Sequence, residues 1–365
     1  MRVTGRSRPN LSGTRWSRAA RLPALATLTL LVATGCGAAT QDGAAPSSPT
    51  GPATGRAGAS LASEGPTQQT LTVGTGLTPE TRHAAYIYQA ALQQAGYRVE
   101  VVDTDPTREA LFASMGLDPA VPQATASPQA TGQPVPTAGL THITPDLTGD
   151  LLLYLTDNGS KGPNNDTLKV RGLSTSDIYN ALGRTLPAGA SLLEPSSATS
   201  RYGYVMTQAT AAHHQISGME DLREHCKDLA LTAPGTYPDN PSGAASLDSD
   251  YSCTPRETST RDDRAEQIQD LITGRTDLAY VFTADPALKT HNLVLLDDPE
   301  RTQLAQNIVP VVRNGELPQE AIDIINSVSA SLTADHLTRL NSLTSGDHPL
   351  TETEAAHFWL TTLKG

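Results

Sequence analysis

From residue 70 onward, the pattern of apolar and polar residues predicts strands and helices that alternate along the chain. TLTVGTG (70–76) predicts a strand that ends in glycines. Thr78-Pro79-Glu80 then supplies an N-cap residue, a proline at the first helical position and an acidic residue in the first turn. Apolar residues on one helical face follow, Gly96 ends the helix, and YRVEVVD (97–103) predicts the next strand. A strand–helix–strand opening predicts a parallel sheet with helices on its faces.

The same two patterns divide the rest of the chain. Residues 278–282 are apolar without interruption, as in strands covered on both faces, and predict a strand within 277–285. Strands are also predicted at 150–159, 201–208, 292–298 and 307–314. Helical spacing predicts helices at 176–186, 218–226 and 264–274, and through most of 317–365. In that last segment Thr333 and the T-x-x-E pair Thr351 and Glu354 are helix N-cap signals. The sequence therefore predicts an α/β fold throughout.

A targeting segment precedes the predicted fold. Residues 1–35 hold six arginines and no acidic residue, and include LPALATLTLLVA (22–33), an apolar run too short to span a bilayer. Small residues lead to Cys36 in LVATGC, which resembles the bacterial lipobox whose cysteine is lipidated. This order of regions predicts a lipoprotein signal peptide at 1–35 and a lipid anchor on Cys36. The alternative is an ordinary secretory signal with a chance cysteine.

Two low-complexity segments have nothing to bury. Residues 36–69 are rich in Gly, Ala, Ser, Pro and Thr, which predicts a flexible tether that lets a lipid-anchored domain stand off the membrane. PAVPQATASPQATGQPVPTAG (119–139) has a similar composition and lies between structured segments, so it is predicted to be a surface loop insertion.

Length and charge narrow the classes of protein. At 365 residues the chain exceeds what one core usually fills, so two lobes or domains are expected. The formal net charge is −12, and it becomes −18 once the six arginines of the targeting segment are removed. Nucleic acid and anionic lipid surfaces would repel so acidic a chain, so neither is predicted as a partner.

The cysteines and the absence of catalytic motifs add two further expectations. With Cys36 assigned to lipid, Cys226 and Cys253 remain, and outside the cytoplasm two such cysteines most often form a disulfide. No metal site is predicted, because His213 and His214 are adjacent and on a helix their side chains point in different directions. The chain has no G-x-S-x-G elbow, P-loop or H-E-x-x-H motif, so no catalytic residue and no cofactor is predicted.

Five segments are informative because of their order along the chain. These are the helix start at Thr78 with AGYRVEVVD downstream, DLLLYLTDNG, LLEPSSATSRYGYVM, DLAYVFTAD and LVLLDDPERTQLAQNIVPVVRN. Together they resemble one family, the substrate-binding proteins of ABC importers for glycine betaine, choline and related osmoprotectants. DLAYVFTAD, for example, stands where that family carries a D-V-x-x-x-Y-S-T-D segment. The resemblance runs from about residue 70 to the C-terminus.

This resemblance implies an α/β, two-lobed, periplasmic-binding-protein-like fold of type II. Each lobe would have a mostly parallel sheet flanked by helices, with the ligand cleft between the lobes. Lobe one would comprise 70–198 and 287–365, and lobe two 199–286, with chain crossings near 198–201 and 283–286. The family also implies a monomer without enzymatic activity at the extracytoplasmic face of the cell membrane. Such a protein captures a small quaternary ammonium ligand and delivers it to an ABC permease.

The resemblance further implies an aromatic ligand site. Two of the family's cage positions fall on Tyr202 and Phe282, and we also expect Tyr154, Tyr251 and Thr78 to contact the ligand. A quaternary ammonium has no N–H to donate, and aromatic faces attract it by roughly 0.5 to 2 kcal/mol per ring when it is desolvated. Tyr237 is an alternative to Tyr251 as a ligand contact. Tyr204 and Tyr280 are expected to pack in the core.

Some positions depart from the family pattern. Leu155 stands where the family has a cage tyrosine, and Tyr154 comes one residue earlier. Because neighbouring strand residues face opposite sides, Tyr154 would reach the cleft only through a bulge or a one-residue shift. Asp157 or Asn158 replaces a glycine of the family, and Thr81 replaces its glutamine. The ligand therefore need not be betaine itself.

Two other functions stay open. A secreted enzyme such as a hydrolase, with scattered Asp, His and Ser residues, would turn over a substrate. A scaffold or sensor of the same fold would have a cleft filled by side chains and would bind no small molecule. Asp297-Asp298 is expected to be a solvated turn.

Overall fold

The computed structural model describes a large part of the chain. The described residues are 70–120, 139–157, 172–240, 242–346 and 348–363. The predicted signal peptide 1–35, Cys36 with the tether 36–69, and most of the predicted insertion 119–139 lie outside the described residues. Among the described helices, none is long and apolar enough to cross a membrane.

The first sheet has five strands in the order β2-β1-β3-β10-β4. Their bounds are β1 Leu71–Gly74, β2 Val99–Val102, β3 Ile143–Leu147, β4 Ala190–Leu192 and β10 Ile308–Arg313. β1 runs parallel to β2 and β3, whereas β10 is antiparallel to both of its neighbours. One strand of the five is therefore inverted, which agrees with the predicted mostly parallel sheet.

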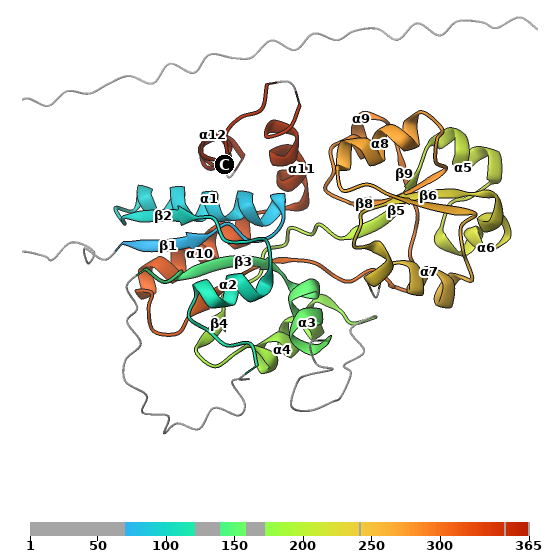
Figure 1. Ribbon diagram of the computed structural model, residues 1–365. Coiled ribbons are helices and arrows are strands. Elements are labelled where there is room, and N and C mark those ends of the chain that lie inside the picture. The colour runs from blue at the N-terminus through green and yellow to red at the C-terminus, as the bar shows by residue number, and fades with distance from the viewer. Residues whose placement is uncertain (1–69, 121–138, 158–171, 241, 347, 364–365) are drawn as a thin grey trace, which may run out of the picture. The chain divides into compact units, whose positions relative to one another are not determined.

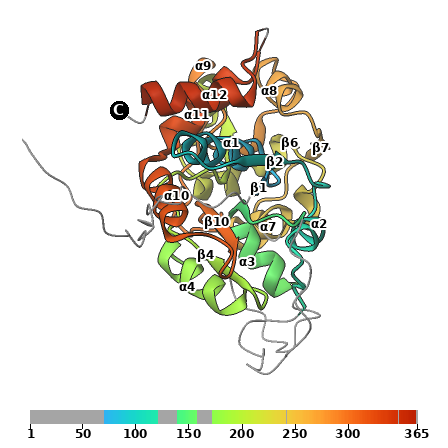
Figure 2. The same ribbon diagram turned by 90° about the vertical axis from the view of Figure 1, so that its left-hand side faces the viewer.

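Helices cover both faces of this sheet (Figure 1). One layer is α1 Pro79–Gln94, α10 Gln319–Ser331, α11 Ala334–Leu343 and α12 Glu352–Phe358, which continues as the π-helical turn Trp359–Leu363; the other is α2 Arg108–Ser114, α3 Thr148–Asp157 and α4 Thr175–Thr185. Side chains of β10 alternate between the layers: Ile308 and Val312 pack with α1, and Val309 and Val311 with α2 to α4. Figure 2 shows the same helices turned by 90°. A strand covered on both faces explains the uninterrupted apolar run.

The second sheet repeats the arrangement, with the order β7-β6-β8-β5-β9. Its strands are β5 Tyr202–Met206, β6 Ala230–Ala233, β7 Glu257–Thr260, β8 Leu278–Phe282 and β9 Val294–Leu295. β5 is the antiparallel strand, paired with β8 and β9. One face packs on α8 Arg264–Ile272 and α9 Ala287–Thr290; the other packs on α5 Gln208–His214, α6 Leu222–His225, α7 Ala244–Tyr251 and the 3₁₀ turns Met219–Asp221, Cys226–Asp228 and Tyr237–Asp239.

These two sheets with their helices confirm the predicted two-lobed α/β fold. We call the elements around the first sheet the first lobe and those around the second sheet the second lobe. The lobe boundaries themselves remain a prediction. β9 follows residue 286 but pairs with β5, so the second sheet extends beyond the boundary expected there. The chain then returns to the first sheet through Leu296–Asn307, which leads into β10.

A disulfide joins Cys226 and Cys253 in the second lobe, where their Cα atoms are 5.3 Å apart. This is the pairing that the cysteine count predicts. Both residues are buried in the core on the α7 side of the sheet. The bond closes a turn-rich segment over that core, and such a closure stabilises the fold mainly by restricting the unfolded chain.

The strand predicted at 150–159 is wrong. Residues 148–157 form α3, and the buried strand is the preceding stretch Ile143–Leu147, which the sequence analysis did not identify. An uninterrupted apolar run does not separate a buried helix from a buried strand. On a helix, neighbouring residues differ by about 100° rather than 180°, so the expectation that Tyr154 needs a bulge to reach the cleft is also wrong.

The helix N-cap signals are confirmed. Thr78, Thr333 and Thr351 each cap the following helix with a side-chain oxygen, and each takes part in a capping box. Gly76, with φ of 72°, makes the turn that brings Thr78 to the start of α1. A Cβ at this position would lie 2.6 Å from the Pro145 carbonyl oxygen, so the turn requires glycine.

Candidate ligand-binding site

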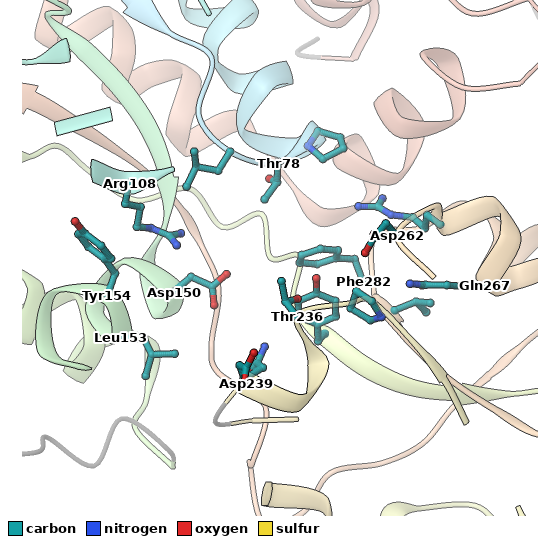
Figure 3. Close-up of a pocket in the computed structure, with 17 residues that line it drawn as sticks. Thr78, Arg108, Asp150, Leu153, Tyr154, Thr236, Asp239, Asp262, Gln267 and Phe282 are labelled. Carbon is teal, nitrogen blue, oxygen red and sulfur yellow. The ribbon is translucent and has the colours of Figure 1, made fainter. Parts of the chain in front are cut away.

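A cavity of about 680 Å³ is lined by residues of both lobes. The first lobe contributes Leu77, Thr78, Pro79, Arg108, Asp150, Leu153 and Tyr154; the second contributes Tyr202, Pro234, Thr236, Asp239, Asn240, Asp262, Arg264, Gln267, Val281 and Phe282. Figure 3 shows Arg108, Asp150 and Tyr154 on one side of this space and Thr236 and Phe282 on the other. The volume lies within the range of sites for small ligands.

Four of the five predicted ligand contacts line this cavity: Thr78, Tyr154, Tyr202 and Phe282. The fifth, Tyr251, lies in the core of the second lobe, and its hydroxyl donates to the Asp298 carboxylate at 2.5 Å. The expectation that Asp298 lies in a solvated turn is wrong, because it is 8% exposed and also accepts backbone N–H groups. The alternative residue, Tyr237, is also buried in that core.

Two of the aromatic residues that line the cavity, Tyr202 and Phe282, belong to a column of three rings. Tyr202 and Phe282 are direct cross-strand partners in β5 and β8, and their ring centroids are 4.0 Å apart. Tyr202 also stacks on Tyr280, with centroids 4.6 Å apart and planes inclined by 8°. The plane of Phe282 is inclined by 28° to that of Tyr202. Both neighbours lie at stacking distance, so each takes one face of the Tyr202 ring. We call Tyr280, Tyr202 and Phe282 the ring stack.

The core end of the stack is fully packed. Tyr204 and Tyr280 are 1% and 0% exposed, which confirms that they pack in the core. Their side chains share one face of the sheet with Tyr202 and Phe282, because each lies two residues away along its strand. Burial raises the pKa of the Tyr202 hydroxyl, and the Asp150 carboxylate raises it further, so this group is neutral.

A cation already occupies the cavity end of the stack. The guanidinium carbon of Arg264 lies 5.1 Å from the centroid of the Phe282 ring. Since Tyr202 covers one face of Phe282, the guanidinium takes the other. The arrangement is a cation–π contact within the protein, and it means that the outermost ring face is attractive to positive charge.

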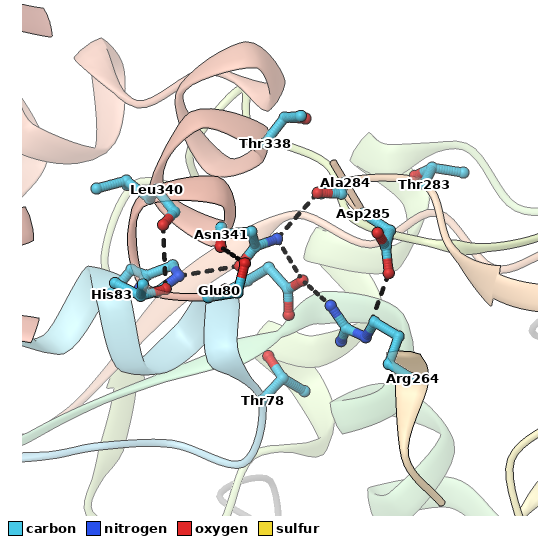
Figure 4. A network of polar contacts seen from close by, with 12 residues as sticks. Thr78, Glu80, His83, Arg264, Thr283, Ala284, Asp285, Thr338, Leu340 and Asn341 are labelled. Atoms are coloured by element: carbon cyan, nitrogen blue, oxygen red, sulfur yellow. Dashed lines mark hydrogen bonds and ion pairs between the residues drawn. The ribbon is translucent and has the colours of Figure 1, made fainter. Parts of the chain in front are cut away.

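Arg264 also belongs to a polar network that links the lobes (Figure 4). Its guanidinium lies 3.5 Å from the carboxylate of Glu80 on α1 and 3.8 Å from that of Asp285, which follows β8. Glu80 is fully buried and also accepts a hydrogen bond from the Asn341 side chain, at 3.0 Å. Asn341 in turn donates to the Ala284 carbonyl and accepts from the ring of His83. Arg264 therefore connects the ligand cavity with buried charges of the first lobe.

On the first-lobe side, a second guanidinium is held still more firmly. Arg108 on α2 makes two hydrogen bonds, at 2.7 and 3.0 Å, to the carboxylate of Asp146, which is 1% exposed. This bidentate geometry is the strongest form of such a pair. Asp150 lies in the first turn of α3, where the Gln306 amide donates to its carboxylate at 2.5 Å.

The two remaining predicted contacts have structural partners of their own. Tyr154 stacks on Phe112 with centroids 6.1 Å apart, and burial raises the pKa of its hydroxyl to about 12, with Glu109 adding to the shift. The Thr78 hydroxyl accepts the Thr81 N–H at 3.3 Å as the cap of α1. Both residues therefore contribute to the cavity wall from positions that the fold already fixes.

The sequence analysis did not identify Arg108, Asp150 or Arg264 as site residues. Asp150 and Arg264 are the first residues of the segments 150–159 and 264–274, and neither belongs to a motif that the sequence pattern singles out. Their part in the cavity follows from the folded structure, which brings them together with residues of the other lobe.

Comparison with known proteins places the chain. The model of a family described as the substrate binding domain of ABC-type glycine betaine transport systems matches residues 69–362. A search of curated proteins finds no match. A solved structure of a glycine betaine/carnitine/choline ABC transporter is similar at 15% identity, covering 80% of this chain and 97% of that one, with a TM-score of 0.60. Apo YehZ from Escherichia coli is similar at 18% identity with the same coverage and a TM-score of 0.56.

The two structural likenesses support the fold, since both identities are low. The family match extends over most of the chain and includes the cavity-lining residues of both lobes. The chain belongs to the family of substrate-binding domains of ABC-type glycine betaine transport systems.

Proposed function

We propose that this protein is a lipid-anchored extracytoplasmic receptor that captures a small quaternary ammonium compound in the cavity and delivers it to an ABC permease. Members of its family are solute-binding proteins of ABC importers, which work outside the cytoplasm and are not a class of enzyme. The proposed anchor, Cys36, lies outside the described residues. The proposed receptor acts as a monomer and needs no cofactor.

The observation that carries the proposal is the ring stack, whose cavity face holds a cation. Phe282 presents this face to the cavity, and the Arg264 guanidinium rests on it. A quaternary ammonium would be attracted to the same face for the same electrostatic reason. Unlike Arg264 it makes no hydrogen bonds, so it loses little by leaving water. We propose that the ammonium of the ligand takes this face and that Arg264 retreats towards Glu80 and Asp285.

Tyr202 has a different part in this proposal. Both of its faces are covered by rings, so it offers the cavity its hydroxyl and ring edge. It therefore fixes the position and tilt of Phe282, and its neutral hydroxyl oxygen can face the methyl groups of the ligand. Thr78 and Tyr154 would close the site from the first lobe.

A thermal-shift screen against glycine betaine, choline, carnitine, ectoine and proline betaine tests the proposal. A ligand at about 100 times its Kd adds about 2.7 kcal/mol to the stability of a protein that binds it only when folded, which is a shift of several degrees. We expect a saturable shift from at least one trimethylammonium compound, and no change in that compound by mass spectrometry.

Two outcomes would contradict the proposal. No shift from any compound would favour a scaffold or sensor of the same fold. Chemical conversion of a compound that binds would favour a hydrolase.

A further inference from the structure

The charges that line the cavity are unbalanced. Among the described lining residues, three carry carboxylates, Asp150, Asp239 and Asp262, and two carry guanidinium groups, Arg108 and Arg264. A cavity that recognised both charged groups of a zwitterion would offer a positively charged group to the carboxylate of the ligand. Whether a ligand carboxylate can bind here therefore depends on whether the two guanidinium groups are already paired with carboxylates of the protein.

Both arginines already face carboxylates that do not line the cavity. Arg108 is held bidentately by Asp146, which is buried. Arg264 lies between Glu80 and Asp285, 0% and 5% exposed. With these partners included, the described groups around the cavity carry more negative than positive charge. A ligand carboxylate would have to compete with a buried carboxylate for either guanidinium.

Asp150 is directed into the cavity, as Figure 3 shows. Gln306, which is 2% exposed, holds it there: its amide nitrogen donates to the Asp150 carboxylate, and its oxygen accepts the N–H groups of Gly149 and Asp150 at 2.9 and 3.1 Å. An acidic residue in a first helical turn is commonly explained by the helix N-terminus. Here the Gln306 oxygen already accepts these two N–H groups, and the carboxylate faces the space opposite Thr236 and Phe282.

Burying the carboxylate of Asp150 is unfavourable, which supports a functional role for this residue. Burial raises the pKa of Asp150, although Arg108 and Gln306 oppose the shift. The cation that opposes it, Arg108, is itself shared with Asp146. A partly buried carboxylate in this state is stabilised by any positive charge that enters the cavity.

We propose that the ligand carries a net positive charge, with Asp150 as the counter-ion of its ammonium group and an uncharged remainder. This deepens the proposed function and rests on it. Choline and glycine betaine have the same trimethylammonium head and differ in a hydroxyl against a carboxylate. The cavity prefers the choline-type cation, because its charge is not cancelled and it brings no carboxylate towards Asp150, Asp239 and Asp262.

Isothermal titration of choline and glycine betaine to the mature protein tests this inference. The wild type is expected to bind choline about tenfold more tightly than glycine betaine, since about 1.4 kcal/mol of unequal electrostatic interaction suffices for that ratio. Asp150→Asn keeps the shape and the oxygen that accepts from Gln306. It should weaken choline binding about tenfold and glycine betaine binding far less, so the ratio collapses.

Asp239→Asn is the matched control, because it removes the same charge from the same cavity at an exposed position. Water and salt screen this charge, so we expect a smaller loss that disappears at high ionic strength. Circular dichroism and thermal unfolding verify that each variant is folded.

The possible failures can be distinguished. If glycine betaine binds the wild type as tightly as choline or more tightly, the inference is overturned while the proposed function stands; this comparison needs no variant. Equal weakening of both ligands by Asp150→Asn also overturns it. If neither compound nor any other ammonium binds the wild type, the proposed function fails, and the inference fails with it.

Discussion

The two walls of the cavity are built in different ways. The second-lobe wall holds the rings of adjacent antiparallel strands, whose pairing places Tyr202 directly opposite Phe282, beside polar residues such as Asp239 and Asp262. In the first-lobe wall the charged residues Arg108 on α2 and Asp150 on α3, which we call the charged wall, stand near the N-terminal ends of helices. Sheet register positions the rings, whereas hydrogen bonds with Asp146 and Gln306 position the charges.

This difference suggests a division of work in recognising an ammonium ion. In the proposed function, the ring stack would attract a methylated cation whatever the rest of the ligand is, because a ring face responds to the charge. The charged wall would distinguish ligands by their total charge. Arg264 connects the ring stack with the first lobe, since it rests on Phe282 and pairs with the buried Glu80.

The largest expected effect comes from removing the middle ring. Tyr202→Ala should weaken choline binding by about tenfold to a hundredfold, or about 1.4 to 2.8 kcal/mol, because Phe282 loses the ring that holds it in place. Tyr204→Ala removes an equal side chain from the buried part of the same strand. It should cost about 3 to 5 kcal/mol of folding stability and change the affinity of the folded protein much less.

Affinity by calorimetry and stability by urea unfolding, measured for both variants, make this comparison. Similar losses of affinity in the two variants would remove the ring stack from the binding site. Tyr202 is only partly buried, so its variant should also be the more stable of the two.

Arg264→Gln should separate affinity from stability. If the ammonium of the ligand replaces the guanidinium on Phe282, removing this competitor should tighten choline binding by about two- to tenfold. The same change leaves the buried Glu80 carboxylate without its cation, which should cost about 1 to 3 kcal/mol of folding stability. Opposite signs in calorimetry and in unfolding are therefore expected.

Arg275→Gln is the control for this variant. Arg275 lies in the same lobe and pairs with a buried carboxylate, that of Asp270, but it does not line the cavity. Its loss should leave choline affinity unchanged, and Arg261 still pairs with Asp270. Weaker choline binding by Arg264→Gln would show instead that the guanidinium is part of the site and not a competitor.

The same division explains how much the sequence could predict. The strands that carry the rings were predicted: the strand in DLAYVF ends at Phe282, and the strand in RYGYVM begins at Tyr202. The family resemblance then placed these two rings at the ligand site. A strand of period two fixes the direction of its side chains once its register is known. The sequence could not indicate that both faces of Tyr202 would be covered, because this depends on the side-chain orientations of the rings across the two paired strands.

The charged wall was largely missed. The run DLLLYLTD was predicted as a strand, and a carboxylate at the start of a strand has no defined direction. Gln306 is 156 residues away from Asp150 in the sequence and reaches it only through the segment that returns to β10. Contacts of this range are set by the packing of the whole fold. The network of Glu80, Arg264 and Asn341 was missed for the same reason.

The pH dependence of binding gives the smallest expected effect and tests the charged wall alone. Choline does not titrate, so a change of affinity with pH reports on the protein. Burial is the main reason that the pKa of Asp150 is raised, and Arg108, Gln306 and Asp146 also act on it. A bound cation favours the ionised form, so affinity should be full above the pKa of Asp150 and fall as the pH is lowered through it. Because that pKa is raised, the fall should begin at a higher pH than the usual aspartate value of about 3.9 would give.

Asp150→Asn should flatten this profile over the range in which the protein remains folded. The sign for stability is the reverse. A raised pKa in the folded state means that the contribution of Asp150 to stability is full below its unfolded-state pKa and is lost as the pH rises through the folded-state value. Without ligand at neutral pH, Asp150→Asn should therefore be slightly more stable than the wild type, although choline stabilises it less. An unchanged pH profile in this variant would assign the titration to another group. Asp285 would be the first candidate, because burial raises its pKa as well.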